Sequence, residues 1–422
     1  MGRRTPGSVD PAAERQISDL LRTAKESLHL SVAFLSRLDE DTQYLEVVES
    51  SGPASLFFKQ GVTQRRETTF CQAILDGRLP PVIPEVARNP VAMSLPSARI
   101  PRIRSYVSVP VTLSDGTLYG TFCAAGLTSD KGLSKRDQAL MEVLAKAAAL
   151  VLEPGIRDRE RREEIEQRLL PLMEVQGGPV VVFQPIVELA TGVRAGAEAL
   201  SRFPAEWGLP PDVCFAEAHS VGLGDRLELL ALTRAAEALD EVGGYVAMNV
   251  SPATLLTAEA QELLRGLPLD RVLLELSEHD PVDDYDELGA ALEPLRRMGM
   301  RLGIDDVGAG FSSLRHIVLT HPDVIKLDRS IVDGVSRDEV LSTLVRSLVV
   351  FARGAGARVV AEGIETEDDA AWLRGLDVDL GQGWWFGRPG PSADLAPTAY
   401  GTPAPADATS PAPPASVRTA RT

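Results

Sequence analysis

The stretch Arg301-Leu302-Gly303-Ile304-Asp305-Asp306 joins a short apolar run to two adjacent carboxylates, and it decides the fold expected for the second half of the chain. Val272-Leu273-Leu274-Glu275 has the same form. Short apolar strands that alternate with amphipathic helices are typical of parallel α/β folds. The pattern predicts strands at 180–189, 195–203, 245–250, 272–276, 301–306, 324–327, 358–361 and 378–381, with helices such as 226–239, 285–298 and 339–355. Eight strands can close a (β/α)8 barrel, so we predict an α/β barrel over 179–392.

Polar side chains stand at the carboxyl ends of these predicted strands. In such a barrel these ends meet at one rim, where active sites form. Carboxylate and amide oxygens suit Mg²⁺ or Mn²⁺, whereas zinc calls for His or Cys. Crowded carboxylates repel one another, and two divalent ions would relieve this, activate a water and stabilise charge on a phosphorus centre. The candidate ligands are Glu198, Asn249, Glu275, Asp305 and Asp306; Lys326 and Glu362 are candidates for orienting water and handling protons.

Composition limits the partners of the chain. Its 422 residues carry a formal charge of −17, which disfavours binding to nucleic acid polymers and to anionic membranes. The three cysteines are scattered and imply no disulfide framework or zinc site. We find no secretory signal and no apolar run of membrane-spanning length, so we expect a cytoplasmic protein.

Changes in pattern predict the domain boundaries. Residues 1–16 are expected to be an unstructured extension, 17–153 a small α+β domain, 154–178 a helical linker and 393–422 an unstructured tail rich in Pro and Ala. Pro154-Gly155 should end the helix expected over 133–152. The apolar stripe Ile165, Leu169 and Leu172 in the linker would form either a dimer seam or a contact with its own domain.

The first domain should place two helices against an antiparallel sheet. The pattern predicts strands at 29–38, 44–49, 107–113 and 118–125, with a helix before the first strand and another after the last. Ser114-Asp115-Gly116-Thr117 has the composition of a tight hairpin turn.

The ordered motifs of the second half resemble the EAL domain family. Glu198-Ala199-Leu200 is the name-giving tripeptide, and the other matching stretches follow it in order. They are Gln184-Pro185-Ile186-Val187 before it, then Asn249-Val250-Ser251-Pro252, Glu275-Leu276-Ser277-Glu278, Asp305-Asp306 with the following loop to Ser313, Lys326-Leu327-Asp328, Ala361-Glu362-Gly363-Ile364-Glu365 and Gln382-Gly383. The family has a modified TIM barrel that hydrolyses cyclic di-GMP to linear 5′-pGpG with Mg²⁺ or Mn²⁺.

The resemblance also implies roles for single residues. Glu198, Asn249, Glu275, Asp305 and Asp306 match metal ligands. Lys326 matches the contact to the nucleophilic water, and Glu362 matches either a general base or a second-metal ligand. Substrate contacts are implied for Gln184, Leu200, Arg202 and Gln382, and coupling of the metal site to dimerisation for Glu278, Gly308, Gly310, Ser312 and Glu365.

The first domain resembles a GAF domain at Ser105-Tyr106-Val107-Ser108-Val109-Pro110 and Gly116-Thr117-Leu118-Tyr119-Gly120-Thr121. This resemblance implies an unknown small ligand or, alternatively, a ligand-free dimerisation scaffold. Cys71 and Cys123 lack the following His of chromophore-binding relatives, so we interpret both as small buried residues.

We therefore expect a homodimeric, metal-dependent cyclic di-GMP phosphodiesterase under the control of a GAF sensory domain. The alternative is a non-catalytic receptor that binds cyclic di-GMP and signals through protein partners.

Overall fold

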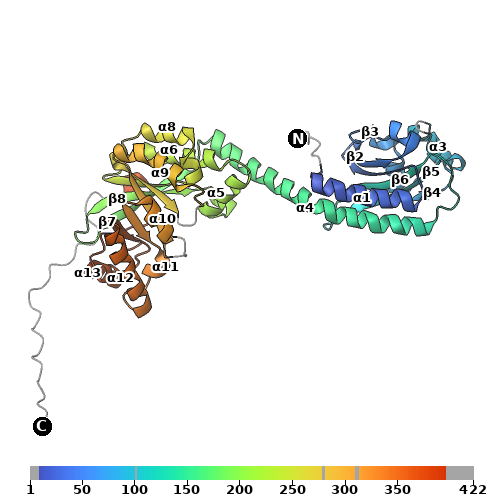
Figure 1. Cartoon of the computed structure of the whole chain (residues 1–422). Helices are drawn as coiled ribbons and strands as arrows, with labels where there is room; N and C mark the ends of the chain where they lie inside the picture. Colours follow the sequence, from blue (N-terminus) through green and yellow to red (C-terminus); the bar gives the residue numbers. More distant parts are fainter. Residues whose placement is uncertain (1–8, 100–101, 278–280, 309–312, 396–422) are drawn as a thin grey trace, which may run out of the picture. The chain divides into compact units, whose positions relative to one another are not determined.

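The chain divides between Glu163 and Glu164 into two units, each with its own core (Figure 1). The computed structural model describes residues 9–99, 102–277, 281–308 and 313–395. The first unit contains a six-stranded sheet and the second a closed barrel.

The first unit is built on an antiparallel sheet with the strand order β3-β2-β1-β6-β5-β4. The strands are β1 Val32–Leu38, β2 Thr42–Ser50, β3 Thr63–Arg65, β4 Val82–Ile83, β5 Ser105–Thr112 and β6 Leu118–Gly126. The helices are α1 Pro11–Ser27, α2 Phe70–Leu75, α3 Pro90–Ser94 and the first part of α4 Lys135–Glu174. One core cluster joins α1 and α4 to the sheet, and a second joins the sheet to α2, α3 and nearby loops. The predicted α+β domain is confirmed.

The start of α1 corrects the predicted N-terminal extension. Residues 11–16, expected to be unstructured, form the first turns of α1. The Asp10 carboxylate accepts hydrogen bonds from the amides of Ala12 and Ala13, and Pro11 occupies the first helical turn, where a missing N–H costs nothing. Residues 1–8 lie outside the described chain.

Helix α4 overturns the predicted break at Pro154-Gly155. It runs without interruption from Lys135 to Glu174. Proline has a helix-compatible φ and removes one hydrogen bond, the one that the Leu150 carbonyl would accept. The Leu150 side chain is 71% exposed, so this face of the helix is open to water that can satisfy the carbonyl.

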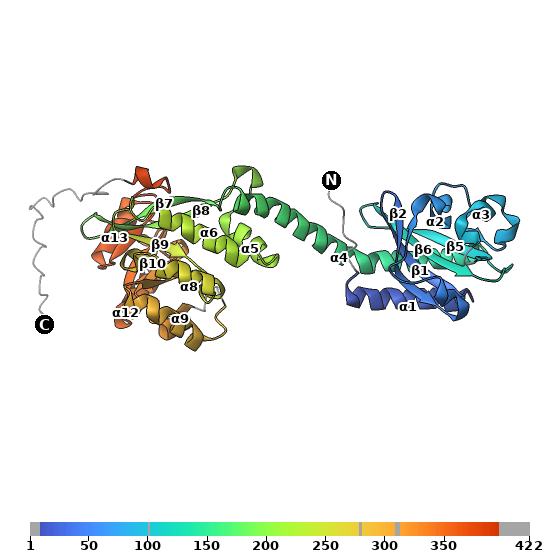
Figure 2. The ribbon, with the colours of Figure 1, turned by 90° about the horizontal axis from the view of Figure 1, so that it is seen from above.

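The second unit is a closed barrel with the strand order β7-β8-β9-β10-β11-β12-β13-β14, surrounded by helices (Figure 2). The strands are β7 Val180–Glu188, β8 Arg194–Arg202, β9 Tyr245–Asn249, β10 Val272–Ser277, β11 Arg301–Val307, β12 Val324–Leu327, β13 Arg358–Ala361 and β14 Leu380–Gln382. The helices are α5 Pro211–Ser220, α6 Gly224–Glu237, α7 Pro252–Leu255, α8 Ala258–Arg265, α9 Tyr285–Arg297, α10 Ser313–Thr320, α11 Arg329–Val332, α12 Glu339–Gly354 and α13 Glu367–Gly375. The barrel prediction is confirmed.

One strand departs from a fully parallel barrel. β7 is antiparallel to both neighbours, β8 and β14, whereas the other neighbouring strands are parallel. The connection from Glu188 to Arg194 is too short for the crossover that parallel neighbours need, so the chain makes a hairpin there. The first residue of β7, Val180, consequently pairs with Arg202 at the carboxyl end of β8.

The stripe of the linker packs within its own unit. Ile165, Leu169 and Leu172 are buried in a cluster with Ala218 of α5 and Leu227 of α6. The sequence left two alternatives for this stripe, a dimer seam or a contact with its own domain, and the structure shows the contact with its own domain.

Residues 393–395, expected to belong to the unstructured C-terminal tail, are described by the structure: Ser392–Asp394 form a short 3-10 helix, and the Ser392 hydroxyl donates to Glu241. Residues 396–422 lie outside the described chain. Among the described helices, none is both long and apolar enough to span a lipid bilayer.

Candidate metal centre

Strand register brings four predicted ligands to one rim of the barrel. Glu198 lies in β8, Asn249 ends β9, Glu275 lies near the end of β10 and Asp305 lies in β11. These four strands are consecutive neighbours, and Asn249 pairs directly with Glu275. Gly303 pairs with Glu275 on the other side, where an added Cβ would approach Glu275 Cγ to 3.3 Å. The glycine therefore leaves room for the glutamate side chain.

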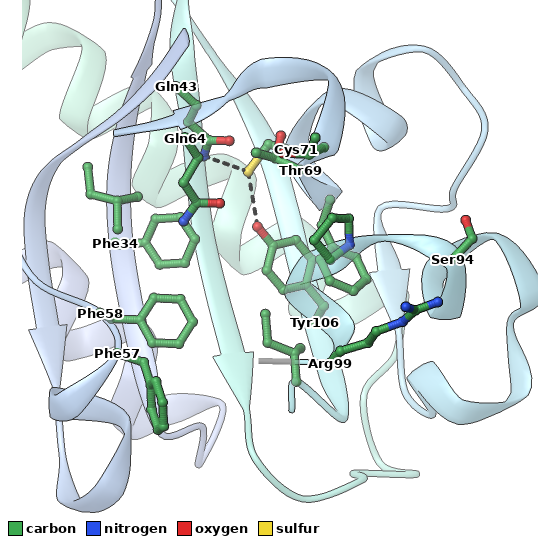
Figure 3. A pocket seen from close by; sticks show the side chains of 15 residues that line it. Phe34, Gln43, Phe57, Phe58, Gln64, Thr69, Cys71, Ser94, Arg99 and Tyr106 are labelled. Atoms are coloured by element: carbon green, nitrogen blue, oxygen red, sulfur yellow. Dashed lines mark hydrogen bonds between the residues drawn. The ribbon is translucent and has the colours of Figure 1, made fainter. Parts of the chain in front are cut away.

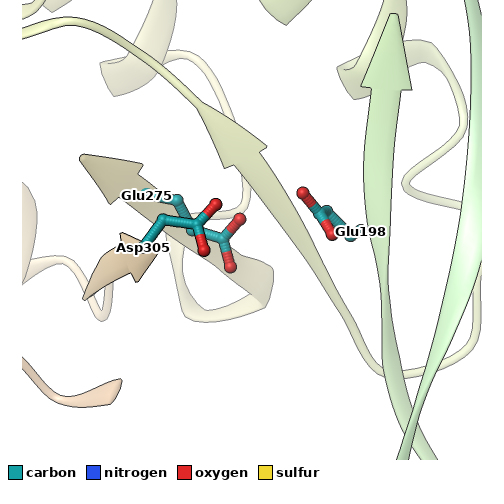
Figure 4. A group of neighbouring side chains, drawn as sticks. All are labelled: Glu198, Glu275 and Asp305. Atoms are coloured by element: carbon teal, nitrogen blue, oxygen red, sulfur yellow. The ribbon is translucent and has the colours of Figure 1, made fainter. Parts of the chain in front are cut away.

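Two groups of carboxylates can each hold a cation. Glu198, Glu275 and Asp305 direct oxygens toward one another (Figure 4), and these oxygens all lie within 4.8 Å of one another. Asp305, Asp306 and Glu362 form a second group under the same limit. Asp305 belongs to both groups, so it could bridge two ions. Asn249 Nδ2 donates to Glu198 Oε1 at 3.2 Å.

The ammonium group of Lys326 lies at the centre of the carboxylates. Lys326 is fully buried in β12, and its Nζ lies 2.6 Å from Glu362, 3.1 Å from Glu275, 3.2 Å from Asp305 and 3.4 Å from Glu198. One positive charge therefore faces four carboxylates. When all four carboxylates are ionised, the cluster carries an excess of negative charge.

The electrostatics follow from burial and from this excess. Burial raises the pKa of Glu275 well above its usual range; Lys326 lowers it only in part, and the neighbouring carboxylates raise it further. Burial likewise raises the pKa of Asp305, and burial together with Asp305 raises the pKa of Glu362. Burial favours the neutral amine of Lys326, but the four carboxylates outweigh it and raise the Lys326 pKa.

The donor set fits a hard divalent cation. Every candidate donor is an oxygen, which matches Mg²⁺ or Mn²⁺. Glu275 Oε1 is buried and has no hydrogen-bond partner, although buried oxygens normally have one. The carboxylate that carries this atom belongs to the group formed with Glu198 and Asp305. A cation there would satisfy it.

The four predicted substrate contacts border the same rim. Gln382 Nε2 donates to Glu198 at 2.5 Å and to Gln184 at 3.0 Å, so these two glutamines connect directly to the acidic cluster. Leu200 and Arg202 instead line a pocket of about 560 Å³, together with Asn249, Glu275 and Asp306. The Arg202 guanidinium donates to the carbonyl of the neighbouring Ser201 at 2.9 Å.

The residues predicted to couple the metal site to dimerisation are only partly described. Gly308 has φ +113°, and an added Cβ would approach Ile331 Cδ1 to 2.6 Å, so glycine is required there. Glu365 forms an ion pair with Arg329 at 2.7 Å. Glu278, Gly310 and Ser312 lie outside the described residues.

Sequence reasoning missed one wall of the pocket. His219 Nε2 lies 2.7 Å from Glu228 Oε1, and Glu228 also accepts bonds from the amide and hydroxyl of Ser251. These residues line the pocket beside Arg202. One His in α5 and one of the two Glu residues of α6 give no signal in the sequence, because only the packing of the two helices brings them together.

The fold and the rim define a barrel protein with one reversed strand and an acidic cluster at the strand ends. The family model for the EAL domain matches residues 166–389, and the model for the GAF domain matches residues 14–153. The chain belongs to the EAL domain family, and its first unit is a GAF domain.

Relatives of the barrel unit carry phosphodiesterase names. The chain is 31% identical over 228 residues to the probable cyclic di-GMP phosphodiesterase PdeB of Escherichia coli, covering 51% of this chain and 43% of that protein. It is 31% identical over 222 residues to the E. coli cyclic di-GMP phosphodiesterase PdeL, covering 49% of this chain and 61% of that protein. A solved complex of the PaMucR phosphodiesterase with c-di-GMP matches at 27% identity and a TM-score of 0.50, covering 55% of this chain and all of that one. The chain thus spans less than two thirds of these curated relatives.

Proposed function

We propose that this protein hydrolyses cyclic di-GMP to linear 5′-pGpG with Mg²⁺ or Mn²⁺. The observation that carries the proposal is the buried, unpartnered Oε1 of Glu275 inside a cluster of carboxylates whose charge exceeds that of Lys326. Relatives named as cyclic di-GMP phosphodiesterases support the substrate.

The two carboxylate groups would hold two ions. Glu198, Asn249, Glu275 and Asp305 would bind the first ion, and Asp305 and Asp306 would serve the second. Divalent ions bound there supply Lewis-acid stabilisation of charge on the phosphodiester and lower the pKa of the attacking water. The excess negative charge of the cluster supports this assignment, because cations lower the repulsion between its members.

Lys326 and Glu362 would orient the water and move its proton. They form the shortest ion pair of the cluster, 2.6 Å, so the ammonium fixes the carboxylate in place. Glu362 could accept the proton or bind the second ion; burial and the neighbouring Asp305 raise its pKa, which makes it a stronger base than a free carboxylate.

The pocket beside the cluster would hold the nucleotide. Arg202 would bind a phosphate through its planar guanidinium, Leu200 would contact a base, and Gln184 and Gln382 would position the substrate against the cluster. The pocket volume of about 560 Å³ suits one nucleotide half of a cyclic dinucleotide.

Regulation belongs to the same proposal. The GAF unit would bind a small ligand and control turnover, and the working protein would be a cytoplasmic homodimer. A ligand-free GAF scaffold remains the alternative for the first unit. The homodimer and the cytoplasmic location stay predictions from the sequence.

A non-catalytic cyclic di-GMP receptor is the second candidate function. The likeness to the c-di-GMP complex supports nucleotide binding without requiring turnover. Retention of all of the predicted ligand types favours the enzyme, because a receptor needs no cation-binding cluster.

Product analysis separates the two functions. Full-length protein should convert cyclic di-GMP to 5′-pGpG with Mg²⁺ or Mn²⁺ and stop when EDTA is added. Glu275→Gln should lower turnover at least ~100-fold, because losing a group that only supports a metal ligand already costs about 10- to 100-fold. The exposed helix variant Glu287→Gln should retain turnover. Tight binding of cyclic di-GMP with either ion present and no linear product would instead establish the receptor.

A further inference from the structure

The GAF unit contains a pocket of about 430 Å³ that the proposed phosphodiester chemistry does not use. Aromatic side chains, among them Phe34, Phe57 and Phe58, line one side of it (Figure 3). Cys71 of α2 forms part of its wall. A small molecule that enters this pocket therefore reaches a thiol.

Hydrogen-bond donors converge on the sulfur of Cys71. Gln43 Nε2 donates to Cys71 Sγ at 3.1 Å, and the Tyr106 hydroxyl lies 3.0 Å from it (Figure 3). Cys123 Sγ of β6 lies 3.3 Å from Cys71 Sγ. Cys123 also contacts the hydroxyls of Ser108 and Thr121, each at 3.2 Å. The two sulfurs are thus held in contact by a polar network in an otherwise apolar core.

This network favours the thiolate of Cys71 over that of Cys123. Burial by itself raises the pKa of Cys71, but hydrogen bonds from Cys123, Thr121, Tyr106 and Gln43 outweigh it and lower the pKa to about 6. Burial and the neighbouring Cys71 raise the pKa of Cys123, which therefore keeps its proton. The Cys71 sulfur is therefore the nucleophile, and the Cys123 sulfur is its protonated partner.

We propose that Cys71 and Cys123 form a redox-active dithiol that reacts with hydrogen peroxide entering the GAF pocket and closes to an intramolecular disulfide. Three features carry this assignment: the contact between the two sulfurs, the donors aimed at Cys71 and the position of Cys71 in the pocket wall. Sulfurs bond at about 2.05 Å, so side-chain rotation must bring them roughly 1.3 Å closer.

The reaction balances in two steps. The Cys71 thiolate attacks one oxygen of peroxide, the O–O bond breaks, and hydroxide leaves and takes up the proton that Cys71 had released, which gives a sulfenic acid and water. Cys123 then attacks the Cys71 sulfur, the S–O bond breaks, and the departing hydroxide takes the Cys123 proton to form the second water. Two thiols are oxidised by two electrons, and one peroxide is reduced to two waters.

Thiol counting on the full-length protein tests the proposal, with the third cysteine as an internal control. Cys214 is also buried, and burial raises its pKa, so it should react slowly. One equivalent of peroxide should consume two of the three thiols, at least about tenfold faster than Cys214. Peptide mass spectrometry should find residues 71 and 123 linked, with a mass loss of two hydrogens.

Single variants separate the two roles. In Cys123→Ser the Cys71 sulfenic acid should accumulate and be trapped by dimedone, whereas in Cys71→Ser residue 123 should remain a thiol. Circular dichroism checks that both variants fold. The proposal is overturned if all three thiols survive, if Cys214 reacts as fast as Cys71, or if Cys71 is oxidised without a link to Cys123.

Discussion

Lys326 compensates the acidic cluster, because its ammonium group lies within 3.4 Å of four carboxylates while fully buried. Removing one partner of a buried ion pair is far more costly than removing an exposed pair, since it leaves uncompensated charge without water. The lysine therefore stabilises the barrel as well as taking part in the proposed reaction.

Substitution Lys326→Met should lower the free energy of unfolding of the metal-free protein by about 3 kcal/mol at pH 7. Methionine keeps most of the volume but removes the charge. Urea denaturation at pH 7 and pH 5 measures the effect, and the loss should be smaller at pH 5, where the carboxylates can take up protons. Arg358→Met is the matched control, because Arg358 is half-exposed and pairs with Glu188 at 3.7 Å; it should cost less than about 1 kcal/mol. Equal losses in the two variants would contradict this account.

The metal-free barrel should lose stability as pH rises from 5 to 8. Burial raises the pKa of Glu275, Asp305 and Glu362 in the folded state, so these groups keep protons that the unfolded chain has already released above pH ~4.5. The folded state then binds more protons than the unfolded state. The free energy of unfolding therefore falls as pH rises, by up to about 1.4 kcal/mol per pH unit for each group. Lys326 adds nothing in this window, because its raised pKa lies far above it.

Urea denaturation in EDTA at several pH values measures this slope. Glu362→Gln should flatten it, since glutamine does not titrate, and saturating Mn²⁺ should remove it. A metal-free stability that rises over the same range would contradict the raised pKa values.

The types of polar residue at the rim could be predicted from the sequence, because each of these residues stands at the end of a short apolar strand. The barrel brings those strand ends together. The contacts within the cluster could not be predicted. The central place of Lys326 depends on register across β12, and the meeting of Cys71 with Cys123 depends on packing of α2 on β6. We interpreted both cysteines as small buried residues; their burial is confirmed, while their contact gives no signal in the sequence.

Helix α4 gives a direct test at the level of secondary structure. Its Gly155 is exposed, and an added Cβ would meet no atom within 4 Å. Gly155→Ala should therefore raise the free energy of unfolding by about 1 kcal/mol, the difference between the two residues in a helix. Thermal denaturation followed by circular dichroism measures the change.

Gly116→Ala is the control for this prediction. Gly116 has open space as well, but its φ is +88° in the hairpin between β5 and β6. Alanine is strained there, so this variant should be less stable by about 1 kcal/mol. Destabilisation by Gly155→Ala would mean that the helix does not continue through Pro154.

Strands of four or more residues could be predicted because their apolar runs are long enough to read. β3 and β4 were missed, since Thr63–Arg65 contains no apolar residue and Val82–Ile83 is only two residues long; the equally short β14 was found because it lies in the predicted strand at 378–381. The continuity of α4 was missed because Pro154 and Gly155 are helix-breaking by propensity, and exposure of both residues lets the helix tolerate them. The reversal of β7 follows from a short connection that a strand pattern alone does not take into account.

The two units have separate cores, and all four tryptophans lie in the second unit, at 207, 372, 384 and 385. Tryptophan fluorescence therefore reports the barrel alone, whereas circular dichroism reports both units. This distribution allows metal binding to be assigned to one unit in the intact chain.

Saturating Mn²⁺ should raise the fluorescence-detected midpoint of thermal unfolding, because a ligand that binds only the folded barrel stabilises it by about 2.7 kcal/mol at a hundredfold excess over its Kd. The part of the circular dichroism transition that belongs to the GAF unit should stay unchanged. Glu275→Gln should reduce the fluorescence shift. An unchanged fluorescence midpoint together with a shifted GAF transition would place the cation elsewhere.

The reversed direction of β7 determines at which end of the barrel the preceding chain joins it. Helix α4 ends at Glu174, and only 175–179 precede Val180, which lies beside Arg202 at the acidic rim. Four residues farther on, Gln184 receives a hydrogen bond from Gln382, whose amide also donates to Glu198. A first strand of ordinary direction would have attached this helix to the opposite mouth of the barrel, a full strand length from the carboxylates. The hairpin thus places the end of α4 within a few residues, along the chain, of the proposed reaction centre.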